Sequence, residues 1–276
     1  MIRCRFMSTT FIDPFDNTGP GGEELDFERK IVEQLRLWLP RIMVVAIDGW
    51  ARSGKNTAGE TICKALNGVL VDSGRFYRAA TKACMNGNVN LESEDAVSQF
   101  CQSAVLDIRL RRESGQATEV EIAVNGCWFT KEELSPLNLE VSKVARVRTV
   151  RDTVNEALHK TERKGRVVML GRDIGSVVCP KTPFKFFLYA PEEVREQRHL
   201  ASNGKPGAIE RDLMDQEHVQ ASENAQKINT GLFPPHQVRY IILFDLWVWL
   251  LSQVDHRHPV NHSVAWGIEP RKVLKK

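Results

Sequence analysis

The chain of 276 residues lacks the features that mark disulfide-rich, zinc-binding or fibrous proteins. Its 6 cysteines are scattered and form no C-x-x-C pair, which argues against a zinc ribbon or a disulfide framework. No internal repeat and no low-complexity tract is visible. We therefore expect free thiols in a reducing compartment and an ordinary globular protein.

Neither sign of charge dominates, and no apolar run is long enough to span a bilayer. The 38 Lys and Arg residues nearly balance 35 Asp and Glu, and a net charge of +3 is too small to indicate a nucleic-acid partner. Residues 1–6 lack the long apolar run of a signal peptide. The most apolar stretch, residues 240–254, contains Asp245 and is shorter than the ~20 residues of a membrane span. The sequence thus predicts a cytoplasmic protein without a membrane segment.

Short apolar runs rich in β-branched residues alternate with helical patterns along the chain. This alternation is typical of an α/β fold with a parallel sheet, here of about five strands, and helices on both faces. Two further runs around Glu113-Ser114-Gly115 indicate a β-hairpin. The predicted strands cover residues 43–47, 69–71, 167–170 and 184–188, and the hairpin covers 106–111 and 119–124.

The two ends of the chain differ from this central pattern. Residues 1–40 form an N-terminal extension with one amphipathic helix, from Glu23 to Leu39, that ends before Pro40. Residues 41–276 form the main domain. Its C-terminal helix, about 238–254, is apolar on almost every face, which predicts core packing, with a homodimer contact as the alternative.

Residues 49–55 read G-W-A-R-S-G-K and fit the pattern G-x-x-x-x-G-K between a strand and a helix. The glycines let successive amides surround an anion at a helix N-terminus, and Lys55 can reach the β- and γ-phosphates. Asn56 replaces the usual hydroxyl residue, and Thr57 follows it. The pattern predicts a site for the donor phosphates; a chance glycine turn is the alternative.

Two more polar clusters directly follow predicted strands, where α/β sheets bind their ligands. Ser73 and Arg78 lie one helical turn apart after the second strand and suit a phosphorylated ligand. Arg172 and Asp173 follow the strand at 167–170, with side chains suited to a phosphate and to a base amine. A turn with a surface arginine, and a structural Arg–Asp pair, are the respective alternatives.

With these motifs in place, the sequence resembles the cytidylate (CMP) kinases, a family of the P-loop nucleoside monophosphate kinases. The resemblance rests on the phosphate loop, on D-S-G-x-x-Y-R, on V-S-K-V-A…V-R and on G-R-D-I-G-S-V-V-C-P. These motifs occupy residues 49–57, 72–78, 141–151 and 171–180 and span roughly residues 44–200.

The resemblance implies a P-loop nucleoside-monophosphate-kinase-like sheet with an NMP-binding insertion at about 75–160, which carries the hairpin, and a lid at about 195–232. It implies Mg²⁺ bound with ATP, with Thr57 as the candidate protein ligand, and catalytic roles for Lys55, Arg78 and Arg172. The implied ATP-binding residues are Gly49, Trp50, Ala51, Arg52, Ser53, Gly54, Lys55, Asn56 and Thr57. The implied CMP-binding residues are Ser73, Arg78, Ser142, Arg151, Arg172 and Asp173.

The lid departs from the family motif R-D-x-x-D-x-x-R. One placement starts at Arg211 and includes Asp215, with His218 in place of the last arginine. Another, at residues 219–226, preserves the spacing and lacks both arginines. Both placements stay open. Arg195 and Arg198 can compensate for a lost lid arginine, or they are solvated charges of a helix.

The resemblance predicts transfer of a phosphoryl group from ATP to CMP or dCMP, by a monomer or a weak homodimer formed through the C-terminal helix. Two alternatives remain. One is a nucleotide-binding protein of the same fold that has lost catalysis and acts as a sensor or interaction module. The other is a kinase for a different small acceptor.

Overall fold

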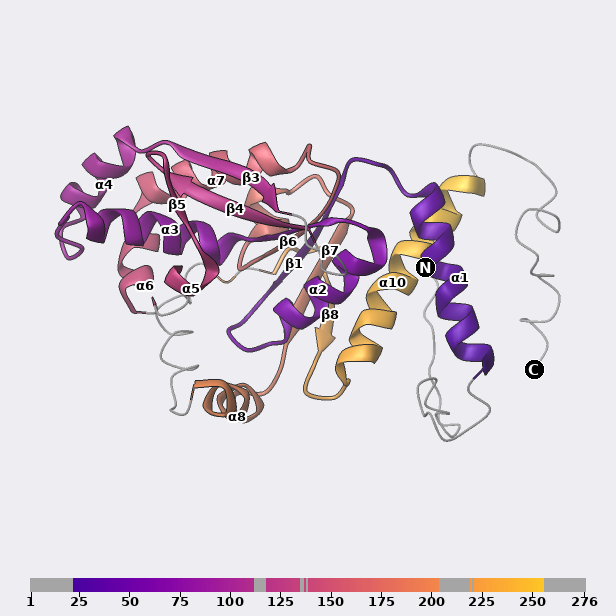
Figure 1. Ribbon diagram of the computed structural model, residues 1–276. Coiled ribbons are helices and arrows are strands. Elements are labelled where there is room, and N and C mark those ends of the chain that lie inside the picture. The colour runs from indigo at the N-terminus through magenta and orange to yellow at the C-terminus, as the bar shows by residue number, and fades with distance from the viewer. Residues whose placement is uncertain are drawn as a thin grey trace.

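A computed structural model describes residues 22–111, 118–134, 137, 139–203, 219 and 221–255. Its centre is an eight-stranded sheet with the order β3-β4-β2-β6-β1-β7-β8, and β5 pairs with β4 outside this path (Figure 1). The strands are β1 (Met43–Gly49), β2 (Val69–Asp72), β3 (Leu106–Arg111), β4 (Thr118–Val124), β5 (Cys127–Phe129), β6 (Arg166–Gly171), β7 (Phe184–Tyr189) and β8 (Gln226–Asn229).

Helices cover both faces of the sheet, as the alternating pattern predicts. One face packs against α3, α4 and α7, and the other against α1, α2 and α10. A short π-helical turn, η1, follows β6. The helical elements are α1 (Gly22–Trp38), α2 (Lys55–Leu66), α3 (Ser73–Asn86), α4 (Glu94–Ser103), α5 (Lys131–Leu134), α6 (Leu139–Ala145), α7 (Arg148–Thr161), η1 (Ile174–Val178), α8 (Glu192–Asn203) and α10 (Pro235–Asp255).

The central strand β1 brings the phosphate loop to the middle of the sheet. All of its residues are buried, and it lies parallel to β6 on one side and to β7 on the other. Val44 and Ala46 enter one core cluster, whereas Val45 and Ile47 enter the other, as the alternation of side chains along a strand requires. The carboxyl ends of β2, β6, β1 and β7 consequently meet at one edge of the sheet.

The hairpin β3–β4 is confirmed, and it extends the central sheet. β4 pairs in parallel with β2 at Val69–Thr118 and Leu70–Glu119. Two helices rather than one lead into β6: α6 ends at Ala145 and α7 begins at Arg148, with Val147 in extended conformation between them. The sequence pattern did not indicate β5 or β8.

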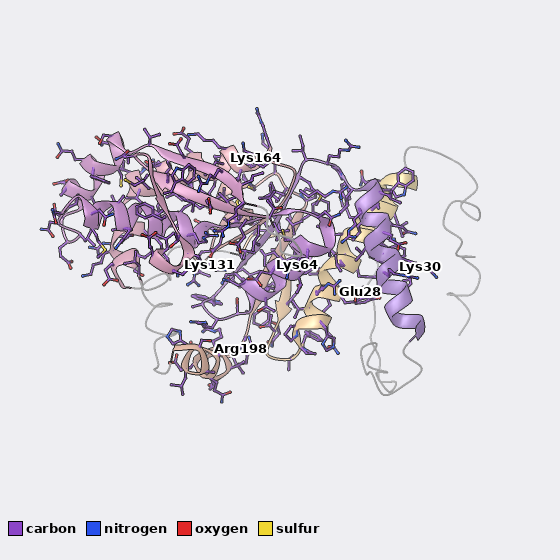
Figure 2. All side chains as sticks on the ribbon, viewed as in Figure 1. Glu28, Lys30, Lys64, Lys131, Lys164 and Arg198 are labelled. Atoms are coloured by element: carbon purple, nitrogen blue, oxygen red, sulfur yellow. The ribbon has the colours of Figure 1, made fainter. Side chains whose placement is uncertain are left out.

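The N-terminal helix α1 and the C-terminal helix α10 lie side by side (Figure 1). An ion pair of 2.6 Å joins Glu28 (Figure 2) to Arg239, and the Trp247 Nε1–H donates to Gln34 Oε1 at 2.6 Å. Five apolar side chains of α10 are buried against α1, α2 and the sheet: Val238, Ile242, Leu243, Leu246 and Leu250. Core packing of this apolar helix is therefore confirmed, while the homodimer contact stays a prediction. Within the described ranges, no helix meets the length and hydropathy of a bilayer span.

Candidate active site

The phosphate loop has the backbone conformation that its glycines allow. Gly49 has a φ of 146° and Gly54 a φ of 87°. A Cβ atom at Gly49 would lie 1.9 Å from the carbonyl oxygen of Leu188, so β7 approaches the loop too closely for any side chain there. The residue type at position 49 is thus set by both conformation and space.

Lys55, the first residue of α2, folds over this loop. Its Nζ donates hydrogen bonds to the carbonyl oxygens of Gly49, at 2.8 Å, and of Trp50, at 2.6 Å. The ammonium group therefore lies at the loop and the N-terminus of α2, where the helix dipole also favours anions. This geometry matches the role of the lysine in G-x-x-x-x-G-K.

Arg195 and Arg198 of α8, for which the sequence left two interpretations open, donate hydrogen bonds to carbonyl groups of the loop. The Arg198 guanidinium donates to the Arg52 carbonyl at 3.3 Å and to the Thr230 hydroxyl at 3.0 Å and carbonyl at 2.7 Å. Arg195, only 4% exposed, donates to the carbonyls of Ala190 and Ala51, so its interpretation as a solvated helix charge is wrong. A buried arginine on a charge-rich helix leaves no periodic signal, which is why the sequence could not decide between the two interpretations of Arg195.

Asp48, the residue before the loop, anchors the turn that follows β6. Its carboxylate accepts hydrogen bonds from the amides of Ile174, at 2.8 Å, and Gly175, at 2.7 Å. Burial raises the pKa of Asp48 to about 6, although these two amides and Lys55 act in the opposite direction. The contact joins the end of β1 to η1 and thereby fixes the position of the adjacent Arg172-Asp173 pair.

The predicted acceptor residues gather on the other side of the loop. Arg151 on α7 forms an ion pair with Asp173, and its guanidinium lies 5.8 Å from the centre of the Tyr77 ring. Burial raises the pKa of Tyr77 to about 12, so this ring stays a neutral phenol. Arg78 on α3 donates to the Leu137 carbonyl at 3.3 Å. Asp173 thus forms its ion pair with Arg151 of α7, and both residues line the predicted ligand site.

Arg172 connects the two sides, because its Nη1 donates to the Gly49 carbonyl at 3.2 Å. The charges also approach one another: burial, together with the positive charge of Arg78, lowers the pKa of Arg52. Guanidinium groups that face each other across a short distance favour an anion between them.

One cleft of about 610 Å³ contains these groups. It is lined by seven of the nine predicted donor residues, Ala51 to Thr57, and by all six predicted acceptor residues. The carbonyl groups of Gly49 and Trp50, the other two predicted donor residues, accept hydrogen bonds from Lys55, which lines the cleft. Arg198 lines it as well, and so do side chains that the sequence analysis did not assign, among them Asp72, Arg75, Tyr77, Lys131 and His199.

Comparison with known proteins identifies the family of this chain. The model of the Cytidylate kinase family matches residues 45–230, about two thirds of the chain. The chain belongs to the cytidylate kinase family.

Relatives from several bacteria support this membership. The chain is similar to a cytidylate kinase of Listeria monocytogenes serotype 4b (strain CLIP80459), with 31% identity over 181 residues, 63% of this chain and 79% of that protein. It is 35% identical to a cytidylate kinase of Bacillus cytotoxicus over 163 residues, 58% of this chain and 70% of that protein. With a cytidylate kinase of Roseiflexus castenholzii it shares 31% identity over 212 residues, 72% of this chain and 91% of that protein.

Within the cytidylate kinase family, the lid remains the part of this chain that departs most from the expected motif. The placement at Arg211 and Asp215 lies outside the described residues. The placement at 219–226 ends on Gln226, the first residue of β8, which pairs with Phe186 of β7 in the central sheet. Arg198 on α8 and Thr230, the residue after β8, both contact the phosphate loop.

The donor side of the cleft suits a metal that arrives with the nucleotide. Thr57 lines the cleft two residues after Lys55 and can offer a hydroxyl to Mg²⁺. The carboxylate of Asp48, by contrast, already accepts hydrogen bonds from the amides of Ile174 and Gly175. In the described parts of the chain, no cluster of three or more His, Cys, Asp or Glu side chains could hold a metal ion. Mg²⁺ bound through the phosphates of ATP, with Thr57 as the protein ligand, fits these donors.

Proposed function

We propose that this member of the cytidylate kinase family transfers the γ-phosphoryl group of ATP to CMP or dCMP, giving ADP and CDP or dCDP, in the cytoplasm. One observation carries the proposal. The phosphate loop and the guanidinium groups of Arg78, Arg151 and Arg172 line the same cleft. Two phosphorylated ligands that react with one another need such a pair of facing cationic sites.

The donor phosphates occupy the loop in this proposal. Amides from residues 49–55 and the dipole of α2 hold the β-phosphate, and Lys55 exchanges its bonds to Gly49 and Trp50 for the β- and γ-phosphates. When bound with ATP, Mg²⁺ supplies charge neutralisation at the same phosphates. Arg195 and Arg198 hold the loop's carbonyls, so the amides keep their orientation toward the ligand.

The acceptor occupies the side formed by α3, α6, α7 and the turn after β6. Arg78 and Arg172 bind its phosphate and offset the repulsion between two anions, which lets the attacking oxygen approach in line with the leaving group. Asp173, held by Arg151, accepts a hydrogen bond from the exocyclic amine of cytosine. Ser73 and Ser142 line the same pocket and offer hydroxyls to the base.

A coupled assay of ADP release with CMP, dCMP, UMP and AMP as acceptors tests this proposal. Turnover with CMP or dCMP at least tenfold more efficient than with UMP and AMP is the expected result. Tight nucleotide binding without turnover would instead identify a binding protein that has lost catalysis. Equal turnover with all four acceptors would contradict the assignment of Asp173 to cytosine.

A further inference from the structure

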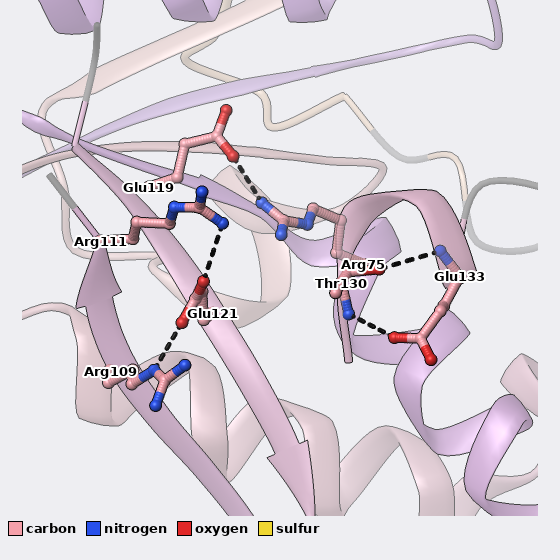
Figure 3. Close-up of polar contacts among 7 residues, drawn as sticks. All are labelled: Arg75, Arg109, Arg111, Glu119, Glu121, Thr130 and Glu133. Carbon is pink, nitrogen blue, oxygen red and sulfur yellow. Dashed lines mark hydrogen bonds and ion pairs between the residues drawn. The ribbon is translucent and has the colours of Figure 1, made fainter. Parts of the chain in front are cut away.

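Two cations of the cleft have no role in the proposed reaction. Arg75 on α3 and Lys131 at the start of α5 line the cleft, and both pair with Glu119 on β4. Arg75 Nη1 lies 2.9 Å from one carboxylate oxygen, and Lys131 Nζ lies 3.6 Å from the other. Figure 3 shows the Arg75–Glu119 contact beside a second, similar cluster. We call Arg75, Glu119 and Lys131 the Glu119 cluster.

The Glu119 cluster carries one more positive charge than negative, because a single carboxylate serves two cations. The Arg75 side chain is only 14% exposed, and its Nε–H is buried with no hydrogen-bond partner among the described residues. A buried donor of a charged group without a partner costs free energy. The surplus positive charge borders the cleft, where it favours an anionic ligand.

The position of Arg75 identifies which ligand this is. Arg75 and Arg78 are three residues apart on α3, so both lie on the same face of that helix, and both line the cleft. Lys131 belongs to α5, which packs against α3. The surplus charge therefore lies on the acceptor side, next to the arginine that the family motif assigns to the acceptor phosphate.

The second cluster on the same strand provides a contrast. Glu121 also serves two cations, Arg109 at 2.5 Å and Arg111 at 3.2 Å (Figure 3). Both of these arginines have side chains 58% exposed, and neither lines the described cleft. The two clusters have similar ion pairs, and they differ in burial and in access to the ligand.

We propose that Arg75, together with Lys131, binds the phosphate of the acceptor nucleotide as a second cationic arm beside Arg78, and that Glu119 holds both cations in place until the acceptor arrives. This inference rests on the proposed function. It assigns Glu119 a positioning role, since that carboxylate acts through the two cations.

Three variants test the inference by their separate effects on the two substrates. Arg75→Gln should raise the KM for CMP about tenfold, because it removes a charge-assisted hydrogen bond, while the KM for ATP changes less than twofold. Glu119→Gln removes the carboxylate that holds both cations in place and should also raise the KM for CMP, by less than Arg75→Gln does. Arg109→Gln is the matched control and should change neither constant. A purely structural ion pair predicts instead that Arg75→Gln and Glu119→Gln lower the melting temperature alike and leave the KM for CMP unchanged.

Calorimetric binding of CMP to the unaltered protein and to the same variants requires no turnover. The inference is supported if Arg75→Gln weakens CMP binding about tenfold and Arg75→Lys weakens it by no more than half that factor. Loss of ATP binding in place of CMP binding overturns it. If the unaltered protein binds CMP without turnover, the proposed function fails and the inference is still decided; if it binds no CMP, both fail.

Discussion

The hydroxyl of Thr230 donates a hydrogen bond to the main-chain carbonyl of Ser53, 2.9 Å away and 177 positions earlier in the chain. Thr230 follows the edge strand β8, and it also accepts a hydrogen bond from Arg198 at 3.0 Å. One buried hydroxyl thus joins the last strand, helix α8 and the phosphate loop. The edge of the sheet helps to set the shape of a loop that follows its central strand.

Thr230→Val should weaken ATP binding, because it removes the hydroxyl that holds the Ser53 carbonyl and leaves that carbonyl without this donor. We expect the KM for ATP to rise about tenfold and the KM for CMP to change less than twofold. Thr230→Ser keeps the hydroxyl and should retain most of the affinity. Steady-state kinetics with each substrate varied separately checks this, and equal effects of Val and Ser would contradict it.

Gly49→Ala should destabilise the protein by at least ~3 kcal/mol, since its Cβ would collide with the Leu188 carbonyl at a φ that only glycine adopts readily. Gly126→Ala is the matched control. Gly126 also has a positive φ, of 79°, but nothing lies within 4 Å of its added Cβ, so its cost should be about 1 kcal/mol. Urea unfolding of both variants measures the difference.

Arg172→Ala should impair the use of CMP far more than the binding of ATP. The arginine lines the acceptor side and contacts the phosphate loop at the Gly49 carbonyl, which Lys55 also holds. We expect a rise of at least about tenfold in the KM for CMP and less than threefold in the KM for ATP. Equal loss for both substrates would show that the acceptor assignment is wrong.

The raised pKa of Asp48 predicts that folding stability falls as the pH rises from about 4 to about 6. In this window the native carboxyl keeps its proton while the unfolded one has lost it, so the native state binds more protons. The loss attributable to Asp48 is on the order of 3 kcal/mol. Denaturant unfolding of the nucleotide-free protein and of Asp48→Asn across this range isolates it. A constant difference between the two proteins would contradict the assignment.

Helix α1 should contribute substantially to stability although it lies outside the residues that match the family. Leu35 is 0% exposed within the core shared with α10, whereas Leu37 on the same helix is 75% exposed. Leu35→Ala should cost about 3 kcal/mol of unfolding free energy, and Leu37→Ala less than about 0.5 kcal/mol. Thermal and urea unfolding of this pair separates a packed helix from a loosely attached one.

Much of the catalytic geometry could be predicted from local sequence patterns. The phosphate loop is recognisable because its glycines are required by backbone conformation. Four buried strands are recognisable because short apolar runs, β-branched in three of them and phenylalanine-rich at 184–188, are distinctive. All six predicted acceptor residues line the cleft. Ser73, Arg172 and Asp173 directly follow a strand, and the other three lie on the helices α3, α6 and α7 between those strands. Their roles toward a nucleotide remain predictions.

Other parts depend on contacts that no local pattern records. β8 reads Q-K-I-N, with one buried residue, Ile228, and its strand character comes from pairing with β7. The parallel pairing of β4 with β2 likewise joins segments far apart in the chain. Arg195 and Thr230 are ordinary polar residues in the sequence, and only the folded chain brings them to the phosphate loop.

The residues that match the family model are fewer than the residues that pack together in the fold. The matched segment, residues 45–230, excludes both α1 and α10, yet these helices supply much of one core cluster, including Ile31, Leu35 and Leu246. A protein trimmed to the matched segment would expose to water the apolar side chains that α1 and α10 cover on one face of the sheet. Expression of such a fragment should give an aggregation-prone product, whatever nucleotide chemistry its loop retains.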